Sequence, residues 1–353
     1  MKKLSWTNKY RKGALQLFSF LFMILCLTGC GTSGREVVDE KKDDTGIKIG
    51  FSVDSLVVER WEKDRDIFVT KAGELGAEVN FQNASGSIEN QKKQIGYLID
   101  RDVDVIVIVA GDSEMFSEEV EAAHKKGIKV IAYDRMLMNA DVDLYISFDN
   151  TEVGRLMGEA FSEKLKKGAK VMMVNGPTTD NNVALVSAGF EEVAGINQWT
   201  ITDISYTDGW KQELAYDYIN EHIDMAKEAD AIMCGNDAIA GQVISALSEN
   251  RIVGDILVAG QDADLDACQR VVEKTQFMTV YKPIDTLAET AAKYAVRLAK
   301  GDLSEELLTE NNGKYDIPCI YVTPYAVTID NIDEMIIDSG FHMRSDVYLN
   351  VTQ

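Results

Sequence analysis

The chain has 353 residues, a length that favours two domains over one, and its 46% hydrophobic content is enough for sizeable cores. Its formal net charge of −22, with no basic stripe after the N-terminus, argues against nucleic acid as a partner, because phosphate binding depends on clustered lysine and arginine. The acidity is instead typical of a protein kept soluble outside the cytoplasm.

The first thirty residues are predicted to be a targeting segment. A positively charged start precedes an apolar stretch over residues 14–27, which is too short for a comfortable membrane span. The stretch ends in Leu27-Thr28-Gly29-Cys30, which resembles a bacterial lipobox. We therefore expect residues 1–29 to be removed as a lipoprotein signal peptide, and Cys30 to be acylated and anchored at the extracytoplasmic face of the membrane. An ordinary secretory signal with a chance cysteine is the alternative.

Three further cysteines, Cys234, Cys268 and Cys319, would remain in the mature chain beside Cys30. They share no short spacing, and an odd number in an exported protein does not make a disulfide framework. Cys234 and Cys319 lie in strand-like runs, so we expect both to be buried as small apolar side chains.

Residues 30–46 are polar and charged, as in a flexible tether, and from residue 47 onward strand and helix patterns alternate. The alternation predicts an α/β fold with parallel sheets covered by helices on both faces. Its two comparable series predict two doubly wound lobes. The expected strands of the first series are 47–53, 77–81, 103–109, 128–133 and 144–148, with helices at 58–75, 87–100 and 114–126. In the second series they are 170–174, 201–206, 230–234, 255–259 and 277–281, with helices at 151–166, 182–195, 210–228, 238–250 and 263–274. A helix at 283–300 and a strand at 317–322 follow.

Many of the expected strands end in amide or charged side chains. In an open parallel sheet, ligands bind outside the carboxyl ends of the strands, so these side chains are candidates for a ligand site. Capping of the following helix is the alternative for any single one of them, and we expect it for Asn150 and Asp237. The candidates at strand ends are Asp134, Arg135, Asp180, Asn182, Asn236, Asp262 and Lys282.

Two of the four tryptophans lie at strand-to-helix junctions in opposite series: Trp61 follows Arg60, and Trp210 follows Asp208-Gly209. Indole rings can cover the apolar C–H faces of a pyranose while polar side chains bind its hydroxyls. Because hydroxyls both donate and accept, a mixture of carboxylates, amides and cations suits a sugar. An anion site would need only donors, and a metal site clustered oxygens or imidazoles. Filling of two cores is the alternative role of the tryptophans.

The motifs of hydrolases and metalloenzymes, G-x-S-x-G and H-E-x-x-H, are absent from the sequence, as is C-x-x-C. Paired carboxylates leave a glycosidase open on composition, but a glycosidase would not need the two-lobed alternation. We therefore predict a binding protein without catalytic residues, bound metal or cofactor.

Several segments resemble the periplasmic D-xylose-binding proteins of the ribose/galactose-binding family, the sugar receptors of ABC importers. The likeness covers about residues 47–345, and the matching segments include LVVERWEKDRDIF (56–68), VIAYDRM (130–136), TDNN (179–182), DGW (208–210), AGQDADLDACQRV (259–271) and MTVYKPI (278–284).

The resemblance implies two Rossmann-like lobes joined by three hinge crossings, near Asn150, Tyr281–Lys282 and Val322–Thr323, which close on one sugar. One lobe would contain residues 47–150 plus 283–321, and the other 151–282 plus 322–345. The resemblance also implies that nine residues contact the ligand directly: Arg60, Trp61, Asp134, Arg135, Asn182, Trp210, Asn236, Asp262 and Lys282. Asp180 and Asp54 are weaker candidates. The family's usual second aspartate beside Asp54 is Ser55 here.

Two partners fit such a receptor besides the sugar itself. An ABC permease is the partner that the resemblance implies, and D-xylose is the sugar that fits it best. A membrane histidine kinase is the alternative, because lobe closure would signal ligand binding equally well to a sensor.

Overall fold

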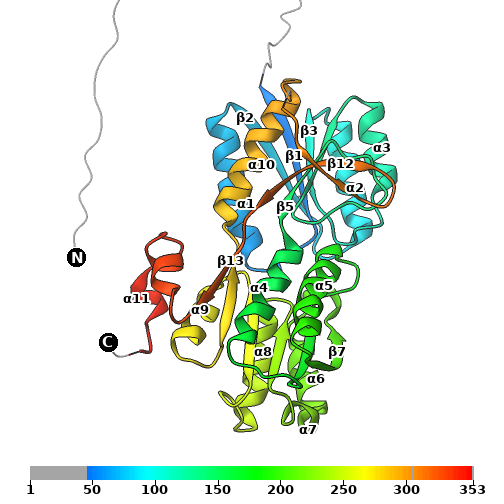
Figure 1. The fold of residues 1–353 in the computed structure, drawn as a ribbon. Coiled ribbons are helices and arrows are strands. Elements are labelled where there is room, and N and C mark those ends of the chain that lie inside the picture. The colour runs from blue at the N-terminus through cyan, green and yellow to red at the C-terminus, as the bar shows by residue number, and fades with distance from the viewer. Residues whose placement is uncertain (1–45, 304, 352–353) are drawn as a thin grey trace, which may run out of the picture. The chain divides into compact units, whose positions relative to one another are not determined.

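Two β-sheets with helices on both faces make up the part of the chain that the computed structural model describes, residues 46–303 and 305–351. Figure 1 shows the two sheets as separate lobes. Among these residues no helix is long and apolar enough to cross a membrane. The predicted signal peptide, the predicted acylation site Cys30 and nearly all of the predicted tether lie outside the described residues.

The sheet of the first lobe has seven strands in the order β11-β12-β5-β4-β3-β1-β2. Its strands are parallel except for β11, which pairs antiparallel with β12 at one edge. The bounds are β1 (Ile47–Val53), β2 (Ala77–Asn83), β3 (Val105–Val109), β4 (Lys129–Tyr133), β5 (Leu144–Phe148), β11 (Leu308–Asn311) and β12 (Asp316–Val322).

The sheet of the second lobe has six strands in the order β13-β10-β9-β8-β6-β7, and its edge strand β13 is antiparallel to β10. Without β11, β12 and β13, the two sheets share one strand order, which reverses between β1 and β3 and between β6 and β8. In doubly wound sheets, ligands bind at that point of reversal. The bounds are β6 (Lys170–Asn175), β7 (Thr200–Tyr206), β8 (Ala231–Cys234), β9 (Leu257–Gln261), β10 (Met278–Tyr281) and β13 (Tyr325–Thr328).

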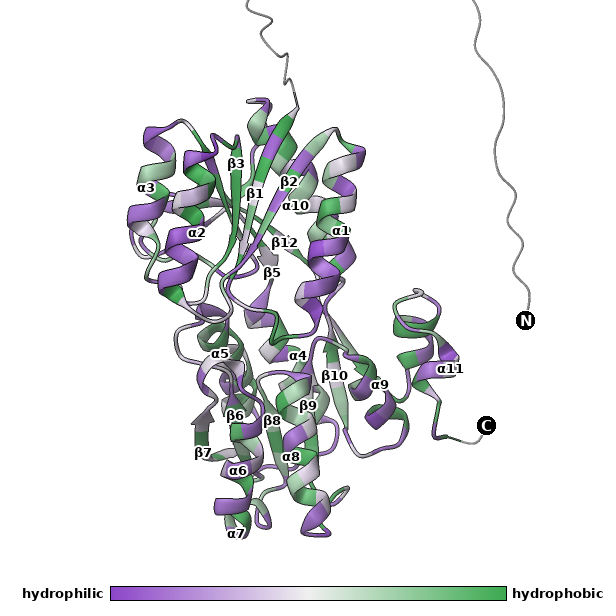
Figure 2. Ribbon diagram, turned by 180° about the vertical axis from the view of Figure 1, so that it is seen from behind, coloured by the Kyte–Doolittle hydropathy of each residue, from purple (hydrophilic) through white to green (hydrophobic). Residues whose placement is uncertain are grey.

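Helices cover both faces of each sheet, and their outward sides are largely hydrophilic while the strands are hydrophobic (Figure 2). In the first lobe, α1 (Arg60–Glu74) and α10 (Ile284–Ala299) cover one face, and α2 (Ile88–Asp100) and α3 (Ser117–Lys125) the other. In the second lobe, α4 (Asn150–Ser162) and α5 (Asn181–Ile196) lie opposite α6 (Glu213–Glu221), α7 (Ile223–Ala226) and α8 (Asp237–Glu249). Helix α9 (Leu265–Val272) packs with α11 (Arg344–Val347) in a smaller cluster.

The central strands are apolar along their whole length because both of their faces are covered. Strand β3, with the sequence VIVIV, is buried at every position. Residues of this strand alternate between the two cores of the first lobe, so that Val105, Val107 and Val109 face α1 and α10, while Ile106 and Ile108 face α2 and α3. The two-sided cores confirm the α/β class and the doubly wound architecture.

The chain passes between the two sheets at three places in the described residues. It leaves the first sheet after β5 and enters α4, returns from β10 into α10, and finally runs from β12 directly into β13 (Figure 1).

The structure differs from the sequence prediction at several elements. The helix expected at 210–228 is broken into a 3₁₀ turn at Asp208–Trp210 followed by α6 and α7, because Gly209 takes a φ of +60° and Lys211 is extended. The two antiparallel edge strands β11 and β13, and a π-helical turn at Asp333–Ile337, were not predicted. Both sheets are therefore mixed. As expected, Cys234 and Cys319 are buried and carry free thiols.

Candidate functional site

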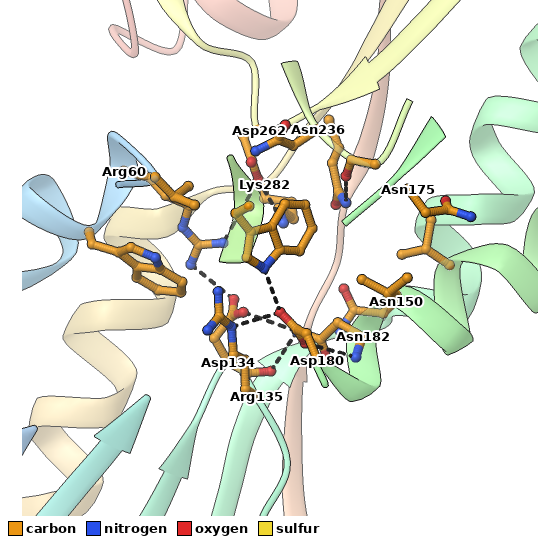
Figure 3. A pocket seen from close by; sticks show the side chains of 17 residues that line it. Arg60, Asp134, Arg135, Asn150, Asn175, Asp180, Asn182, Asn236, Asp262 and Lys282 are labelled. Atoms are coloured by element: carbon orange, nitrogen blue, oxygen red, sulfur yellow. Dashed lines mark hydrogen bonds and ion pairs between the residues drawn. The ribbon is translucent and has the colours of Figure 1, made fainter. Parts of the chain in front are cut away.

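A pocket lies between the two lobes, where the carboxyl ends of both sets of parallel strands meet (Figure 3). The space between its lining atoms that no protein atom fills is about 470 Å³, a figure that includes open solvent. The structure brings together in its lining every ligand-binding candidate predicted from sequence except the weaker candidate Asp54: Arg60, Trp61, Asp134, Arg135, Asp180, Asn182, Trp210, Asn236, Asp262 and Lys282.

Arg60, the first residue of α1, is buried and lies near carboxylates from both lobes. Its Nε and Nη2 donate to Asp64, one helical turn further on, at 3.3 and 3.1 Å. Nη2 also lies 3.0 Å from Asp134 Oδ2, and Nη1 lies 3.9 Å from Asp262 Oδ1 in the second lobe. Because the guanidinium has five donors in a fixed planar fork, one side chain can contact all three carboxylates. Arg60 thereby connects α1 to both walls of the pocket.

Asp134 directly follows β4 in a left-handed backbone conformation, with a φ of +62° that few non-glycine residues adopt. Its carbonyl oxygen accepts hydrogen bonds from the hydroxyls of Tyr145 (3.1 Å) and Ser147 (2.6 Å) and from the amide of Asn182 (3.1 Å). The Asn182 amide donates to Asp134 Oδ1 as well, at 3.1 Å. Asn182 belongs to the second lobe, so these bonds join the lobes and hold the unusual backbone in place.

The two buried carboxylates on this side of the pocket have opposite pKa shifts. Burial opposes ionisation of Asp134, but Arg60, Lys282 and Arg135 together hold its pKa below the ordinary value. Burial raises the pKa of Asp180, and the nearby Arg135 only partly offsets this effect. Asp134 is therefore the carboxylate that the cations of the pocket keep ionised.

Asp180 joins the two lobes through Arg135. Arg135 Nε lies 2.7 Å from Asp180 Oδ2, and its Nη1 donates to the carbonyl oxygen of Ala110 at 2.8 Å. The same Asp180 oxygen accepts a hydrogen bond from Trp210 Nε1 at 3.2 Å, while Oδ1 accepts one from the backbone N–H of Asn182 at 3.0 Å. The carboxylate thus orients both the indole of Trp210 and the guanidinium of Arg135. Figure 3 shows Asp180 beside Arg135.

Asp262 and Lys282 form a buried ion pair on the second-lobe wall, with Lys282 Nζ 2.7 Å from Asp262 Oδ1. Asp262 has a φ of +101°, and its backbone N–H donates to the carbonyl oxygen of Val280 at 2.9 Å. The pair follows the ends of two neighbouring parallel strands, β9 and β10, which explains why residues twenty positions apart meet.

Both indole rings line the pocket and also pack on hydrophobic cores. Trp61 is only 5% exposed and stacks beneath the guanidinium of Arg60, whose carbon lies 4.4 Å from the ring centroid. Trp210 is half-buried and packs closely over Gly176, where an added Cβ would lie 2.4 Å from the ring atom Cη2. The sequence left two roles open for the tryptophans, filling a core or lining the pocket. Each ring does both in the structure.

Three polar atoms of the pocket lining are buried and have no hydrogen-bond partner among the described residues: Asn182 Oδ1, Asn175 Nδ2 and Gln261 Oε1. Buried polar groups are normally paired, because an unpaired group costs about 1–3 kcal/mol. Two of these atoms accept and one donates, so a ligand that pairs with all three must offer both donors and acceptors. Hydroxyl groups meet that requirement, whereas a simple anion or cation does not.

Two of the predicted helix caps are wrong. The residue that caps α4 is Asp149, whose side chain accepts from the backbone N–H of Glu152, so Asn150 is the first helical residue and its side chain lines the pocket. At α8 the cap is Asn236, which accepts from Ile239, and Asp237 is the first helical residue, fully buried behind the pocket. In both cases two consecutive polar residues lie at the start of the helix, and the sequence alone does not show which of the two caps it.

Asp54 and Ser55 lie in a separate hollow outside the pocket lining, between loops of the two lobes. Asp54 Oδ2 is 3.5 Å from Arg135 Nη1, so this carboxylate contacts the pocket only through Arg135. The residues that sequence reasoning did not single out as ligands but that line the pocket are Val58, Asn150, Asn175, Val183, Val186, Gly235 and Gln261. For Asn150, Asn175 and Gln261, the available signal was the same as for the others, a polar residue at or just after the end of a strand.

Comparison with known proteins places the chain beside sugar-binding proteins. A family described as "Periplasmic binding protein domain" matches residues 49–303. The D-xylose-binding periplasmic protein of Escherichia coli is 42% identical over 306 residues, which are 85% of this chain and 92% of that protein. The protein of the same name from Haemophilus influenzae is 39% identical, over 86% of this chain and 92% of its own length.

Solved structures with the same fold include two solute-binding proteins of carbohydrate or ABC transporters. The protein from Clostridium phytofermentans, with bound β-D-glucose, has a TM-score of 0.77 and 27% identity, covering 85% of this chain and 99% of its own. The protein from Chloroflexus aurantiacus, in complex with D-glucose, has a TM-score of 0.77 and 26% identity, covering 84% and 97%.

Proposed function

Because the chain belongs to the periplasmic binding protein family, whose members bind solutes and catalyse no reaction, we propose that it is an extracytoplasmic receptor for a pyranose, D-xylose. The observation that carries the proposal is the lining of the interlobe pocket. It combines two indole rings with unpaired donor and acceptor atoms and with buried ions of both signs. Such a lining fits a flat ring with apolar faces and a rim of hydroxyls.

D-Xylose is favoured over a hexose by the relatives rather than by the pocket alone. The two curated relatives at 39–42% identity, which this chain covers almost end to end, carry D-xylose in their names. The solved neighbours with bound glucose are more distant, at 26–27% identity. A pentopyranose lacks the hydroxymethyl group on C5, so selectivity for xylose would come from a pocket with no room for that group.

Calorimetry of residues 31–353 with D-xylose, D-ribose, L-arabinose, D-glucose and D-galactose tests the proposal. We expect D-xylose to bind most tightly, with a negative heat-capacity change because the sugar faces are buried against the indoles. Tighter binding of glucose than of xylose would overturn the assignment of the sugar. Absence of heat from all five sugars would overturn the sugar-receptor proposal.

We propose that the receptor delivers the bound sugar to an ABC permease after its lobes have closed. Closure would bend the three crossings, near Asn150, Tyr281–Lys282 and Val322–Thr323, where only short segments join the sheets. A role as a sensor for a membrane histidine kinase would use the same closure, and neither the relatives nor the described residues favour it.

Membrane attachment is proposed through acylation of Cys30, which would keep the receptor beside its permease. Mass spectrometry of the N-terminal peptide from the native host should show a chain that begins at Cys30 with added acyl mass. A soluble chain cut after another residue, with an unmodified Cys30 peptide, would overturn the anchor while leaving the sugar proposal intact.

A further inference from the structure

The Asp262–Asp264 turn, which follows β9 and carries the pocket carboxylate, has an uncommon backbone. Asp262 and Ala263 have φ values of +101° and +54°, in a region that L-residues seldom adopt. Two consecutive residues of this kind are held only where their surroundings fix them, at a cost of about 1–3 kcal/mol each. The position of the Asp262 carboxylate beside Lys282 therefore depends on whatever holds the turn.

The carboxylate of Asp237, which does not line the pocket, holds the Asp262–Asp264 turn in place. Its Oδ2 accepts a hydrogen bond from the backbone N–H of Asp264 at 3.1 Å and another from the Thr279 hydroxyl at 2.6 Å. The Thr279 oxygen in turn accepts from the backbone N–H of Ala263 at 3.2 Å. Asp237 Oδ1 accepts from Gln276 Nε2 at 2.8 Å. Both backbone N–H groups after Asp262 thus end on Asp237, directly or through Thr279.

Two glycines make room for this arrangement. A Cβ on Gly260 of β9 would lie 2.2 Å from Asp237 Oδ1, so the carboxylate can reach the turn only because β9 has no side chain there. A Cβ on Gly241 of α8 would lie 3.1 Å from Arg270 Nη1. Arg270 Nη2 donates to the carbonyl oxygen of Asp237 at 2.9 Å, which fixes the start of α8. The carboxylate itself is fully buried and does not line the pocket.

We propose that Asp237 is a positioning residue for ligand binding, which holds the Asp262–Asp264 turn so that the Asp262 carboxylate stays in place beside Lys282 and Arg60 in the pocket. The inference rests on the proposed function and deepens it, because it assigns control of affinity to a side chain that does not touch the ligand. Loss of the Asp237 acceptor would free the backbone N–H of Asp264 and the hydroxyl of Thr279, whose oxygen accepts from Ala263, and would allow the turn to relax.

The charge of Asp237 makes this control dependent on pH. Burial raises its pKa to about 7, and the bond from Thr279 and the nearby Arg270 offset only part of the effect. Below that pH the protonated group would present an O–H to neighbours that are themselves donors, so we expect affinity to fall as pH falls through about 7. The groups that face Asp237 from the elements packed against it are Thr279, Gln276, Arg270, Asp262, Asp264, and the thiols of Cys234 and Cys268.

The test measures the Kd for D-xylose between about pH 6 and pH 8 in residues 31–353 with Asp237→Asn and with Thr279→Val. We expect each change to raise Kd about tenfold at pH 8, the size expected for one lost bond to a charged group. Wild-type Kd should rise about tenfold on acidification, and Asp237→Asn should remove most of that rise; the remainder would come from Asp180 and Asp264, whose pKa values burial also raises. Thr279→Ser, which keeps the hydroxyl, should restore wild-type binding.

Asp230→Asn is the matched control, because Asp230 lies at the opposite end of the same sheet and also accepts a backbone N–H bond, from Lys170 at 2.7 Å. It should leave Kd and its pH dependence unchanged. If Asp237→Asn and Thr279→Val bind as wild type, or if Asp237→Asn keeps the pH dependence while it only lowers the melting temperature, the proposal is wrong. Absence of xylose binding by the wild-type chain would instead overturn the proposed function.

Discussion

At the scale of single residues, the apolar face that Trp210 offers to the pocket depends on Gly176. The indole lies so close to this glycine that an added Cβ would be 2.4 Å from Cη2. We expect Gly176→Ala to push the ring toward the ligand and to raise the Kd for D-xylose at least about tenfold, although no polar contact is removed. Calorimetry checks this. Gly195→Ala, with nothing within 4 Å of its Cβ, is the control and should bind as wild type.

Removal of either ring should have a comparable effect. Trp61→Ala and Trp210→Ala delete the two apolar surfaces of the pocket, and aromatic burial and stacking of this kind contribute about 1.5–3 kcal/mol. We expect each variant to bind D-xylose more than about tenfold more weakly, with its far-UV circular dichroism unchanged. Unchanged affinity in both variants would show that the rings serve the cores alone.

The contacts of Arg60 require a guanidinium rather than any cation. Three of its nitrogens point to carboxylates of Asp64, Asp134 and Asp262, and a lysine ammonium at the same position could not reach all of them. Arg60→Lys should therefore raise the Kd for D-xylose by about tenfold or more while keeping the net charge. Fluorescence titration against wild type measures this, and an equal Kd would mean that only the charge of Arg60 matters.

That these polar residues line one pocket was predictable from sequence, but their hydrogen-bond partners were not. Strand ends in an α/β chain converge at one edge whatever the side chains are, so polar residues at those ends had to meet. Which polar atoms remain unpaired, as in Asn175 and Gln261, depends on packing that a sequence does not display. The same limit explains why Asn150 was assigned to a cap when its neighbour Asp149 caps the helix.

At the scale of elements, helices α4 and α5 pack backbone to backbone through two glycines. A Cβ on Gly154 of α4 would lie 1.9 Å from the carbonyl oxygen of Val186, and one on Gly189 of α5 would lie 1.9 Å from that of Thr151. Since backbone cannot move aside as a side chain does, Gly154→Ala and Gly189→Ala should force the helices apart. We expect each to lower the free energy of unfolding by at least about 2 kcal/mol.

Urea denaturation of these variants, with Gly195→Ala in the same helix α5 as the control, checks the prediction. The control should be neutral or slightly stabilising, because its Cβ points into open space and alanine favours helix. Val186, beside the contact, also lines the pocket, so the two destabilised variants should bind sugar more weakly as well. Stability equal to wild type in both would mean that the helices can separate without loss.

The central elements were predictable and the peripheral ones were not, for a physical reason. Strands such as β3 and β8 are buried on both faces and leave a continuous apolar run in the sequence. Strand β11 is exposed at every position, and its pairing with β12 depends on backbone hydrogen bonds that no side-chain pattern records. The break after Trp210 likewise depends on the positive φ of Gly209, which a helical pattern of apolar residues conceals.

At the scale of the whole folded unit, the two lobes meet at the pocket and again outside its lining, at a contact between Ser113 and Thr179 that we call the outer contact. The backbone N–H of Ser113, in the first lobe, donates to the carbonyl oxygen of Thr179, in the second, at 3.0 Å. Inside the pocket, Arg135 reaches Asp180 and Arg60 approaches Asp262. If sugar binding draws the lobes together, formation of the outer contact reports whether the pocket is occupied.

A cysteine pair at the outer contact tests whether the lobes close on the sugar. In residues 31–353 with Ser113→Cys and Thr179→Cys, the native thiols of Cys234, Cys268 and Cys319 are buried, and burial raises the pKa of each, so they should react slowly. We expect mild oxidation to cross-link the new pair more than about tenfold faster with saturating D-xylose than without it, because the ligand stabilises the closed state. Non-reducing electrophoresis over time measures the rate.

The cross-linked protein gives the converse result. When the outer contact is cross-linked, a sugar already in the pocket should exchange with labelled D-xylose far more slowly than in the reduced protein, since release requires the lobes to part. Single-cysteine variants should show neither effect. Equal cross-linking rates with and without sugar, together with free exchange in the locked form, would mean that the lobes do not move on binding, and the receptor would then need another way to report its occupancy to a permease.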